Sequence, residues 1–196
     1  MNNNLFNLSD KVAVVTGGAG LMGSKHIEAL AELGAIVYLL DISKKEAIKT
    51  KNKINKIYDN STFFIHTDIT NEKNIIDSFK YIKKKNKKVD ILINNAALNP
   101  KAKIIKKKYS NKLKNFNLNN WQKEIDVGLT GAFLCSKIFG YDMSKNKKGV
   151  IINISSDLGI IAPDQRIYKD LNEVKPVTYS VIKHGIIGLT KYIATY

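Results

Sequence analysis

The stretch "TYSVIKHG" carries a tyrosine and a lysine at a spacing that could support proton transfer. Tyr179 and Lys183 are four residues apart, so on a helix they lie on the same face. An isolated tyrosine loses its proton only at about pH 10, and a neighbouring ammonium group favours the phenolate. Such a pair could act as a general acid and base. The same spacing also arises by chance in many helices, so a purely structural interpretation stays open at this point.

The glycine-rich segment "VVTGGAGLMG" offers a second kind of chemistry. Gly17, Gly20 and Gly23 lie between an apolar run and an amphipathic stretch, the order expected where a strand leads into a helix. Glycines let the backbone turn tightly and approach a pyrophosphate, which the amides at the start of the helix then bind. Asp41 ends the next apolar run, where a carboxylate binds ribose hydroxyls and repels the extra phosphate of NADP. The segment therefore predicts a dinucleotide site that prefers NAD over NADP, rather than a simple tight turn.

The elements that would position these residues alternate along the chain. Short apolar runs predict strands and amphipathic stretches predict helices, and repeated units of this kind form a parallel sheet with helices on both faces. Residues 98–118 are polar and are predicted to form a loop over the sheet. No internal repeat or linker divides the chain, so residues 1–196 are predicted to form a single domain. The expected strands are 11–17, 36–41, 62–68, 89–97 and 149–156, and the expected helices are 21–35, 45–58, 71–85, 120–140 and one from about residue 177.

The charge of the chain is strongly positive, at +15, which raises nucleic acid as a partner. The composition argues against that class, because Arg166 is the only arginine among 32 basic residues, and nucleic-acid sites favour arginine with interleaved aromatic residues. The run Lys83–Lys88 is interpreted instead as a solvated helix end, where lysine also suits the helix dipole. No nucleic-acid partner is predicted.

The remaining composition points to a protein of the cytoplasm. No apolar stretch approaches the ~20 residues that a membrane-spanning helix needs, and no signal peptide precedes the first strand. Cys135 is the only cysteine, which excludes an internal disulfide, and it is interpreted as a buried helix residue rather than a nucleophile. No membrane partner and no metal site are predicted.

Four motifs occur in one order along nearly the whole chain: the segment from Thr16 to Gly23, then "NNAA", "NISS" and "YSVIK". This order resembles the short-chain dehydrogenase/reductase family. The resemblance implies an α/β fold with a Rossmann-type, doubly wound parallel sheet. It also implies NAD(P)-dependent oxidation of alcohols or reduction of carbonyl groups, and with it the acid–base interpretation of Tyr179 becomes the favoured one.

The resemblance implies a role for each residue that matches a family motif. Ser156 would hydrogen-bond the substrate oxygen, Tyr179 would be the general acid and base, and Lys183 would act on the phenol and hold the nicotinamide ribose. Asp68 and Ile69 would flank the adenine. The other residues implied to line the cofactor, besides Tyr179 and Lys183, are Gly17, Gly20, Leu21, Met22, Gly23, Asp41, Asn94, Asn95, Ala96 and Ala97.

Two positions depart from the family pattern. Ala97 stands where the family usually has glycine. Gly128 stands where the family ordinarily has an asparagine that supports a water in the proton relay, so the resemblance implies the tyrosine chemistry but not this relay. A glycine inside a helix costs roughly 1 kcal/mol relative to alanine, so Gly128 is expected to serve close packing or to leave room for water or substrate.

A narrower resemblance concerns the substrate. The segments around Gly128, Ser156 and Tyr179 look like those of bacterial short-chain dehydrogenases found with genes for surface sugars and flagellin glycans, as in polysaccharide biosynthesis. This implies a sugar-derived alcohol or carbonyl substrate. The polar stretch Pro163–Lys175 would then lie beside it.

Family members continue beyond the position that corresponds to Tyr196, so the chain is expected to lack the last strands of the family fold. Two functions follow as hypotheses. One is an NAD-dependent oxidoreductase, with NADP less favoured; the other is a nucleotide-binding but catalytically incompetent fragment of such an enzyme. Family dimers and tetramers pair through the helices that begin near Asn119 and Val177, so a homo-oligomer is expected.

Overall fold

A computed structural model describes residues 6–59, 61–98, 111–171 and 174–196. Most of the predicted loop over 98–118, and residues 172–173 of the polar stretch before Tyr179, lie outside these ranges. The chain forms two compact units, residues 1–96 with 134–152 and residues 97–133 with 153–196. The single domain expected from the sequence stays a prediction.

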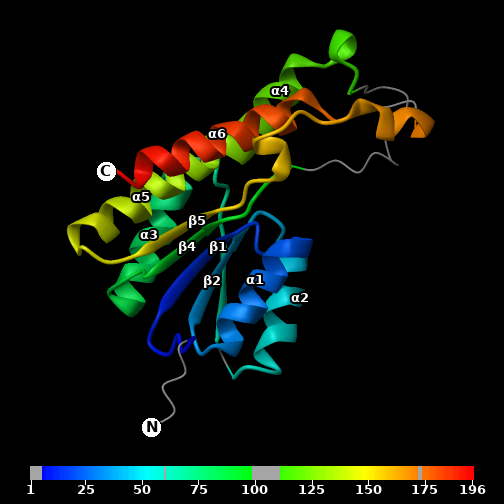
Figure 1. Cartoon of the computed structure of the whole chain (residues 1–196). Helices are drawn as coiled ribbons and strands as arrows, with labels where there is room; N and C mark the ends of the chain where they lie inside the picture. The colour runs from blue at the N-terminus through cyan, green and yellow to red at the C-terminus, as the bar shows by residue number, and fades with distance from the viewer. Residues whose placement is uncertain (1–5, 60, 99–110, 172–173) are drawn as a thin grey trace. The chain divides into compact units, whose positions relative to one another are not determined.

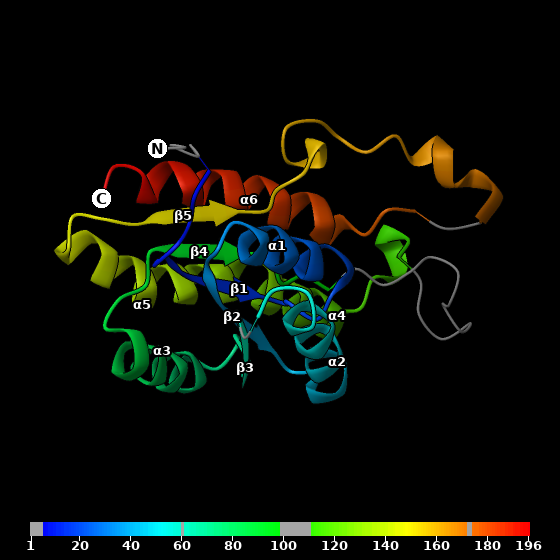
Figure 2. The same ribbon diagram turned by 90° about the horizontal axis from the view of Figure 1, so that it is seen from below.

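A five-stranded sheet forms the centre of the first unit. Its strands are β1 (Val12–Thr16), β2 (Ile36–Asp41), β3 (Thr62–His66), β4 (Ile91–Asn94) and β5 (Val150–Asn153), and they lie in the order β3-β2-β1-β4-β5 (Figure 2). The pairs β1–β2, β1–β4 and β2–β3 are parallel. The chain moves outward from β1 to β3 and then crosses to β4, so the strand order reverses between β1 and β4. Ligands of open α/β sheets bind at the carboxyl ends of the strands at such a reversal.

Helices cover both faces of this sheet. Figure 1 shows α1 (Leu21–Glu32) and α2 (Lys44–Asn55) over one face, and α3 (Glu72–Asn86) and α5 (Gly131–Lys145) over the other. All five residues of β1 are consequently buried, which explains its unbroken run of apolar and β-branched residues. The doubly wound parallel sheet predicted from the sequence is therefore confirmed.

The lysine-rich run at residues 83–88 closes α3, as predicted. Lys83, Lys84 and Lys85 lie in its last turn, and Lys87 ends the helix in the left-handed conformation, with φ of 62°. The ammonium of Lys83 lies 2.9 Å from both carboxylate oxygens of Asp142 on α5. The run therefore helps to join two helices of the first unit.

The second unit contains α4 (Leu118–Ile125) and α6 (Val177–Ile193), with the short helices η2 (Leu113–Asn115), η4 (Asp157–Gly159) and η5 (Gln165–Leu171). The long helix predicted over 120–140 is confirmed, since residues 118–145 are helical throughout, but η3 (Asp126–Thr130), a π-helical turn, lies between its α4 and α5 segments. The core of this unit consists of Ala132, Ile182 and Ile186, surrounded by Ile125, Leu129 and Leu189. Among the described helices, none has both the length and the apolar character needed to cross a bilayer.

Gly128 lies in the π-helical turn, in contact with α6. A Cβ atom at this position would lie 2.9 Å from Cγ2 and 3.0 Å from Cδ1 of Ile182. The absence of a side chain therefore allows α6 to pack closely, and the family's asparagine would require Ile182 to move. This favours the close-packing interpretation of Gly128 over an open space for water or substrate.

We expect Gly128→Ala to lower the free energy of unfolding by roughly 1 kcal/mol, because overpacking at Ile182 outweighs the better helix propensity of alanine. Gly188→Ala is the matched control. Gly188 is also helical, in α6, but its Cβ would meet no atom within 4 Å, so this variant should gain about 0.5–1 kcal/mol. Urea denaturation followed by circular dichroism measures both differences.

The same substitution in an Ile182→Ala background separates the steric cause from a backbone cause. Gly128→Ala should become neutral or stabilising there, because the clashing methyl groups are gone. If it remains as destabilising as in the wild-type background, contact with Ile182 is not the reason for glycine at this position.

Candidate active site

The glycine-rich segment forms the turn that joins β1 to α1, as predicted. Gly17 has a φ of +62°, and a Cβ atom there would lie 2.7 Å from Cα of Ala96. A Cβ atom on Gly23 would collide with the carbonyl oxygen of Gly17, so the start of α1 packs directly on the turn. Both positions need glycine for a close approach of backbones.

Side chains at the ends of β1 and β4 hold this turn in place. The Thr16 hydroxyl accepts hydrogen bonds from the backbone amides of Asn95 and Ala96, each at 3.1 Å. In return, Nδ2 of Asn95 donates to the carbonyl oxygens of Thr16, at 3.0 Å, and Gly17, at 3.1 Å. Asn95 was predicted as a cofactor contact, and its amide also fixes the loop that the phosphates would approach. Ala97 follows this cluster and is exposed.

The first turn of α1 presents backbone amides without a side-chain cap. Its N-cap residue is Gly20, and no acidic residue lies in the first turn. Leu21 and Met22 are 89% and 54% exposed. Backbone amides that no side chain caps at the start of a helix bind phosphate groups, and the helix dipole favours the same negative charge.

Asp41 lies at the carboxyl end of β2 and is attached to the glycine-rich turn. Its Oδ2 atom accepts from the backbone amide of Ala19 at 3.0 Å, and Oδ1 accepts from the amide of Ser43 at 2.8 Å. Each carboxylate oxygen keeps one further lone pair for a ribose hydroxyl. The carboxylate therefore fits the predicted role in binding ribose.

Asp68 and Ile69 follow the end of β3. Oδ1 of Asp68 accepts from the amide and the hydroxyl of Thr70, at 2.9 and 2.7 Å, and Ile69 is only 7% exposed. Asp68 therefore stabilises a turn, and its predicted place beside the adenine stays a prediction.

The close glycines, the uncapped helix start and Asp41 together fit the phosphates and ribose of a dinucleotide.

The second unit brings the predicted catalytic lysine into its interior. Lys183 is 7% exposed, and its ammonium donates to the carbonyl oxygen of Ile154 at 2.5 Å. Ser155 donates to the carbonyl oxygen of Lys183 at 2.9 Å, which attaches the segment after β5 to α6. Burial lowers the pKa of Lys183, and the positive charge of Lys175 lowers it further.

Tyr179 and Ser156 lie on two elements that pack together, α6 and the start of η4. The Lys183 ammonium lies 5.8 Å from the centroid of the Tyr179 ring. The Ser156 hydroxyl donates to the Asp157 carboxylate at 2.6 Å and accepts from the Leu158 amide at 3.3 Å. The serine proton is engaged by Asp157 in this arrangement, so the hydroxyl must turn away from that carboxylate to donate to a substrate oxygen.

The structure adds side chains that the sequence interpretation missed. Lys175 and Asp157 flank the predicted catalytic residues, and the hydrogen bond from Thr178 to the buried carboxylate of Glu124 joins the start of α6 to α4. Lys175 is one lysine among many, so no local signal distinguished it. The sequence offered only one cue to the role of Glu124, namely an acidic residue four positions before Gly128 within a predicted helix.

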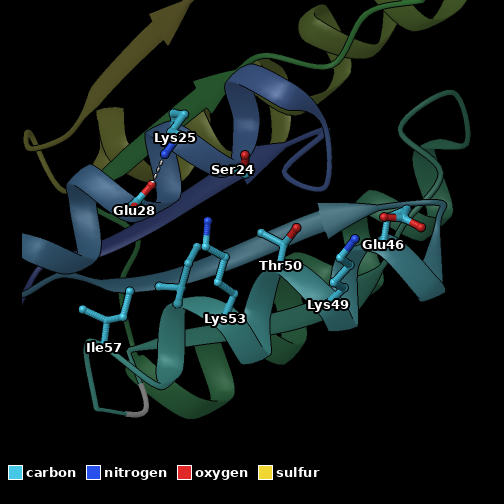
Figure 3. A pocket seen from close by; sticks show the side chains of 9 residues that line it. Ser24, Lys25, Glu28, Glu46, Lys49, Thr50, Lys53 and Ile57 are labelled. Carbon is cyan, nitrogen blue, oxygen red and sulfur yellow. Dashed lines mark hydrogen bonds and ion pairs between the residues drawn. The ribbon is translucent and has the colours of Figure 1, made fainter.

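Other groups in the described residues do not form sites of this kind. Cys135 is buried in α5, and burial raises the pKa of its thiol to about 12, which excludes a thiolate nucleophile at neutral pH. The described ranges contain no cluster of three or more His, Cys, Asp or Glu residues that could hold a metal ion. A groove between α1 and α2 is shown in Figure 3; Ser24, Lys25, Glu28, Glu46, Lys49, Thr50, Lys53, Ile54 and Ile57 line it.

Comparison with known proteins gives sequence relatives along nearly the whole chain. An NAD-dependent glycerol dehydrogenase of Listeria innocua serovar 6a is 36% identical over 191 residues, covering 96% of this chain and 65% of that protein. The 15-hydroxyprostaglandin dehydrogenase [NAD(+)] of Rattus norvegicus is 32% identical over 192 residues, covering 95% of this chain and 62% of that protein. The chain thus spans less than two thirds of the length of either relative.

Solved structures share the fold. Levodione reductase superposes with a TM-score of 0.81 at 22% identity, covering 95% of this chain and 66% of that chain. NAD⁺-bound xylitol dehydrogenase superposes with a TM-score of 0.80 at 22% identity, covering 96% of this chain and 65% of that chain.

The model of the family described as short chain dehydrogenase matches residues 11–195. This match extends from the first strand through the helix of Tyr179 and Lys183, and the chain belongs to the short-chain dehydrogenase family.

Proposed function

We propose that this chain is an NAD-dependent oxidoreductase that transfers a hydride between nicotinamide and an alcohol or carbonyl group, with Tyr179 as general acid and base. The observation that carries the proposal is the environment of Tyr179 on α6. A buried ammonium, that of Lys183, is held one helical turn away by the carbonyl oxygen of Ile154. Among the described residues no carboxylate forms an ion pair with it. A buried cation left in this state favours a negative charge on a neighbouring phenol.

The first unit would hold the cofactor. The amides at the start of α1 would bind the pyrophosphate, Asp41 would bind the adenosine ribose, and Asn95 would keep the glycine-rich turn in shape. The preference for NAD follows from Asp41, and the names of two relatives specify NAD as well. When bound, NAD supplies the nicotinamide carbon that accepts or gives the hydride.

The second unit would handle the proton. In the oxidative direction the Tyr179 phenolate would remove the proton of the substrate hydroxyl, while the Ser156 hydroxyl, turned away from Asp157, would donate to the substrate oxygen. Lys183 supplies the positive charge that favours the phenolate, and by family resemblance it also holds the nicotinamide ribose. In the reductive direction the phenol returns the proton to the carbonyl oxygen.

For the substrate we propose a polyol or another sugar-derived alcohol. The glycerol dehydrogenase among the relatives supports a polyol, whereas the prostaglandin dehydrogenase shows that the family accepts quite different alcohols. The link to surface-sugar synthesis, a homo-oligomeric state and a cytoplasmic location stay predictions. Incubation of the purified chain with NAD and a panel of glycerol, xylitol and longer sugar alcohols, followed through NADH absorbance, tests the proposal. NAD binding without turnover of any alcohol would favour the nucleotide-binding fragment.

We expect Tyr179→Phe to lower kcat by about 10²–10⁴-fold while the Kd for NAD stays nearly unchanged, because the ring still packs and only the proton-bearing oxygen is lost. Lys183→Met should damage both kcat and NAD affinity. Tyr192→Phe is the matched control, since Tyr192 lies on the same helix but is 67% exposed. Full activity in Tyr179→Phe would show that the Tyr179–Lys183 pair is structural.

We expect Asp41→Asn to narrow the ratio of the NADP and NAD dissociation constants by on the order of tenfold. Two unit charges about 4 Å apart repel each other by about 1 kcal/mol in water and by about 4 kcal/mol at an effective dielectric constant of about 20. A tenfold change in the ratio of dissociation constants corresponds to about 1.4 kcal/mol, which lies within this range. Asparagine keeps an acceptor for the Ala19 amide, so the glycine-rich turn should stay intact. Calorimetric titration with both nucleotides measures the ratio, and equally tight binding of NADP and NAD by the wild-type protein would refute the role given to Asp41.

A further inference from the structure

A second lysine lies closer to the Tyr179 ring than Lys183 does. The ammonium of Lys175 is 3.7 Å from the centroid of that ring, whereas the ammonium of Lys183 is 5.8 Å away. At such a distance an ammonium over the face of an aromatic ring makes a cation–π contact. Tyr179 therefore has two cations beside it, one four residues before it in the chain and one four residues after it.

The position of Lys175 is fixed by its backbone. Its amide donates to the side-chain oxygen of Gln165 at 2.9 Å, and Pro176, with φ of −57°, follows as the N-cap residue of α6. Lys175 is partly buried, and burial lowers its pKa, while the negative charge of Asp157 acts in the opposite direction. Within the described ranges Lys175 forms no ion pair, so its charge acts on the ring without a carboxylate in direct contact.

The other charged groups around Tyr179 do not replace this cation. Asp157, on η4, has its carboxylate engaged by the Ser156 hydroxyl and the Leu158 amide. On α4, Glu124 accepts from Thr178, and on η3, Asp126 accepts from Gln122. The remaining titratable groups on these packed elements are Lys123 on α4 and His184, Lys191 and Tyr192 on α6 itself.

We propose that Lys175 is a positioning residue for the acid–base chemistry of Tyr179: its ammonium holds the ring from one face and favours the negatively charged form of the phenol. The inference rests on the proposed function. It assigns to this chain a second cation at the phenol, in addition to the one expected four residues after it. Lys175 contacts the Tyr179 ring, whereas the residues assigned to the pyrophosphate and the adenosine ribose lie on α1 and β2. Its loss should therefore affect the proton step and leave NAD affinity nearly unchanged.

The test compares Lys175→Met and Lys175→Arg with Lys191→Met, which changes an exposed lysine of α6. We expect the acidic limb of the kcat/KM profile for alcohol oxidation by NAD to move up by about one pH unit in Lys175→Met, because without the cation the phenolate forms only at higher pH. Below that limb kcat/KM then falls about tenfold. Lys175→Arg should restore most of the activity, and Lys191→Met should match the wild type.

A measurement without turnover keeps this inference separate from the proposed function. In protein labelled with [¹³Cζ]-tyrosine, the resonance missing from Tyr179→Phe identifies Tyr179, and its titration midpoint should move to higher pH in Lys175→Met. An inactive wild-type chain would refute the proposed function, while this titration would still decide on Lys175. An unchanged titration midpoint of Tyr179 in Lys175→Met would overturn the inference. An unchanged pH profile with only KM raised would also overturn it, and would indicate that Lys175 contacts substrate instead.

Discussion

The hydrogen bond from the buried Lys183 ammonium to the carbonyl oxygen of Ile154 is the contact on which the second unit's chemistry depends. A buried cation is costly unless its donors are satisfied, and here a backbone carbonyl does so without neutralising the charge. The segment after β5 must therefore lie against α6, and the bond from Ser155 to the Lys183 carbonyl reinforces the same junction. Ser156 follows directly in the chain, so the contact that keeps the cation buried also determines where the serine hydroxyl lies.

In the first unit, polar side chains hold a loop of backbone in place. Its glycine-rich turn has only the methyl group of Ala19 as a side chain, and its shape is set by hydrogen bonds of Thr16 and Asn95 at the ends of two neighbouring strands. The strand order reverses between these same strands, so the polar contacts at the reversal serve structure and site together. A parallel sheet buried on both faces holds the two strand ends in register beneath them.

The sheet and the glycine-rich turn could be predicted because each depends on local, periodic signals. Helix α2 ends at Asn55, earlier than expected, since the Asn55 side chain bonds both the amide and the carbonyl of Thr62 at the start of β3. The close packing at Gly128, within the π-helical turn, was not predictable either, because the side chain that Gly128 accommodates, Ile182, is more than fifty residues away in the chain. Lys175 was hidden for another reason: in a chain this rich in lysine, only the three-dimensional position of a lysine reveals which charge acts on a ring.

The two hydrogen bonds of Asp41, to the amides of Ala19 and Ser43, have a consequence for the thermodynamics of binding. A free carboxylate side chain loses rotational freedom when a ligand engages it, and that loss weakens affinity. Here the backbone has already restricted the carboxylate to one orientation, and the same bonds restrain the loop at the start of α1. A ligand that contacts both therefore meets a preorganised surface, so a larger share of its contact energy is retained as affinity.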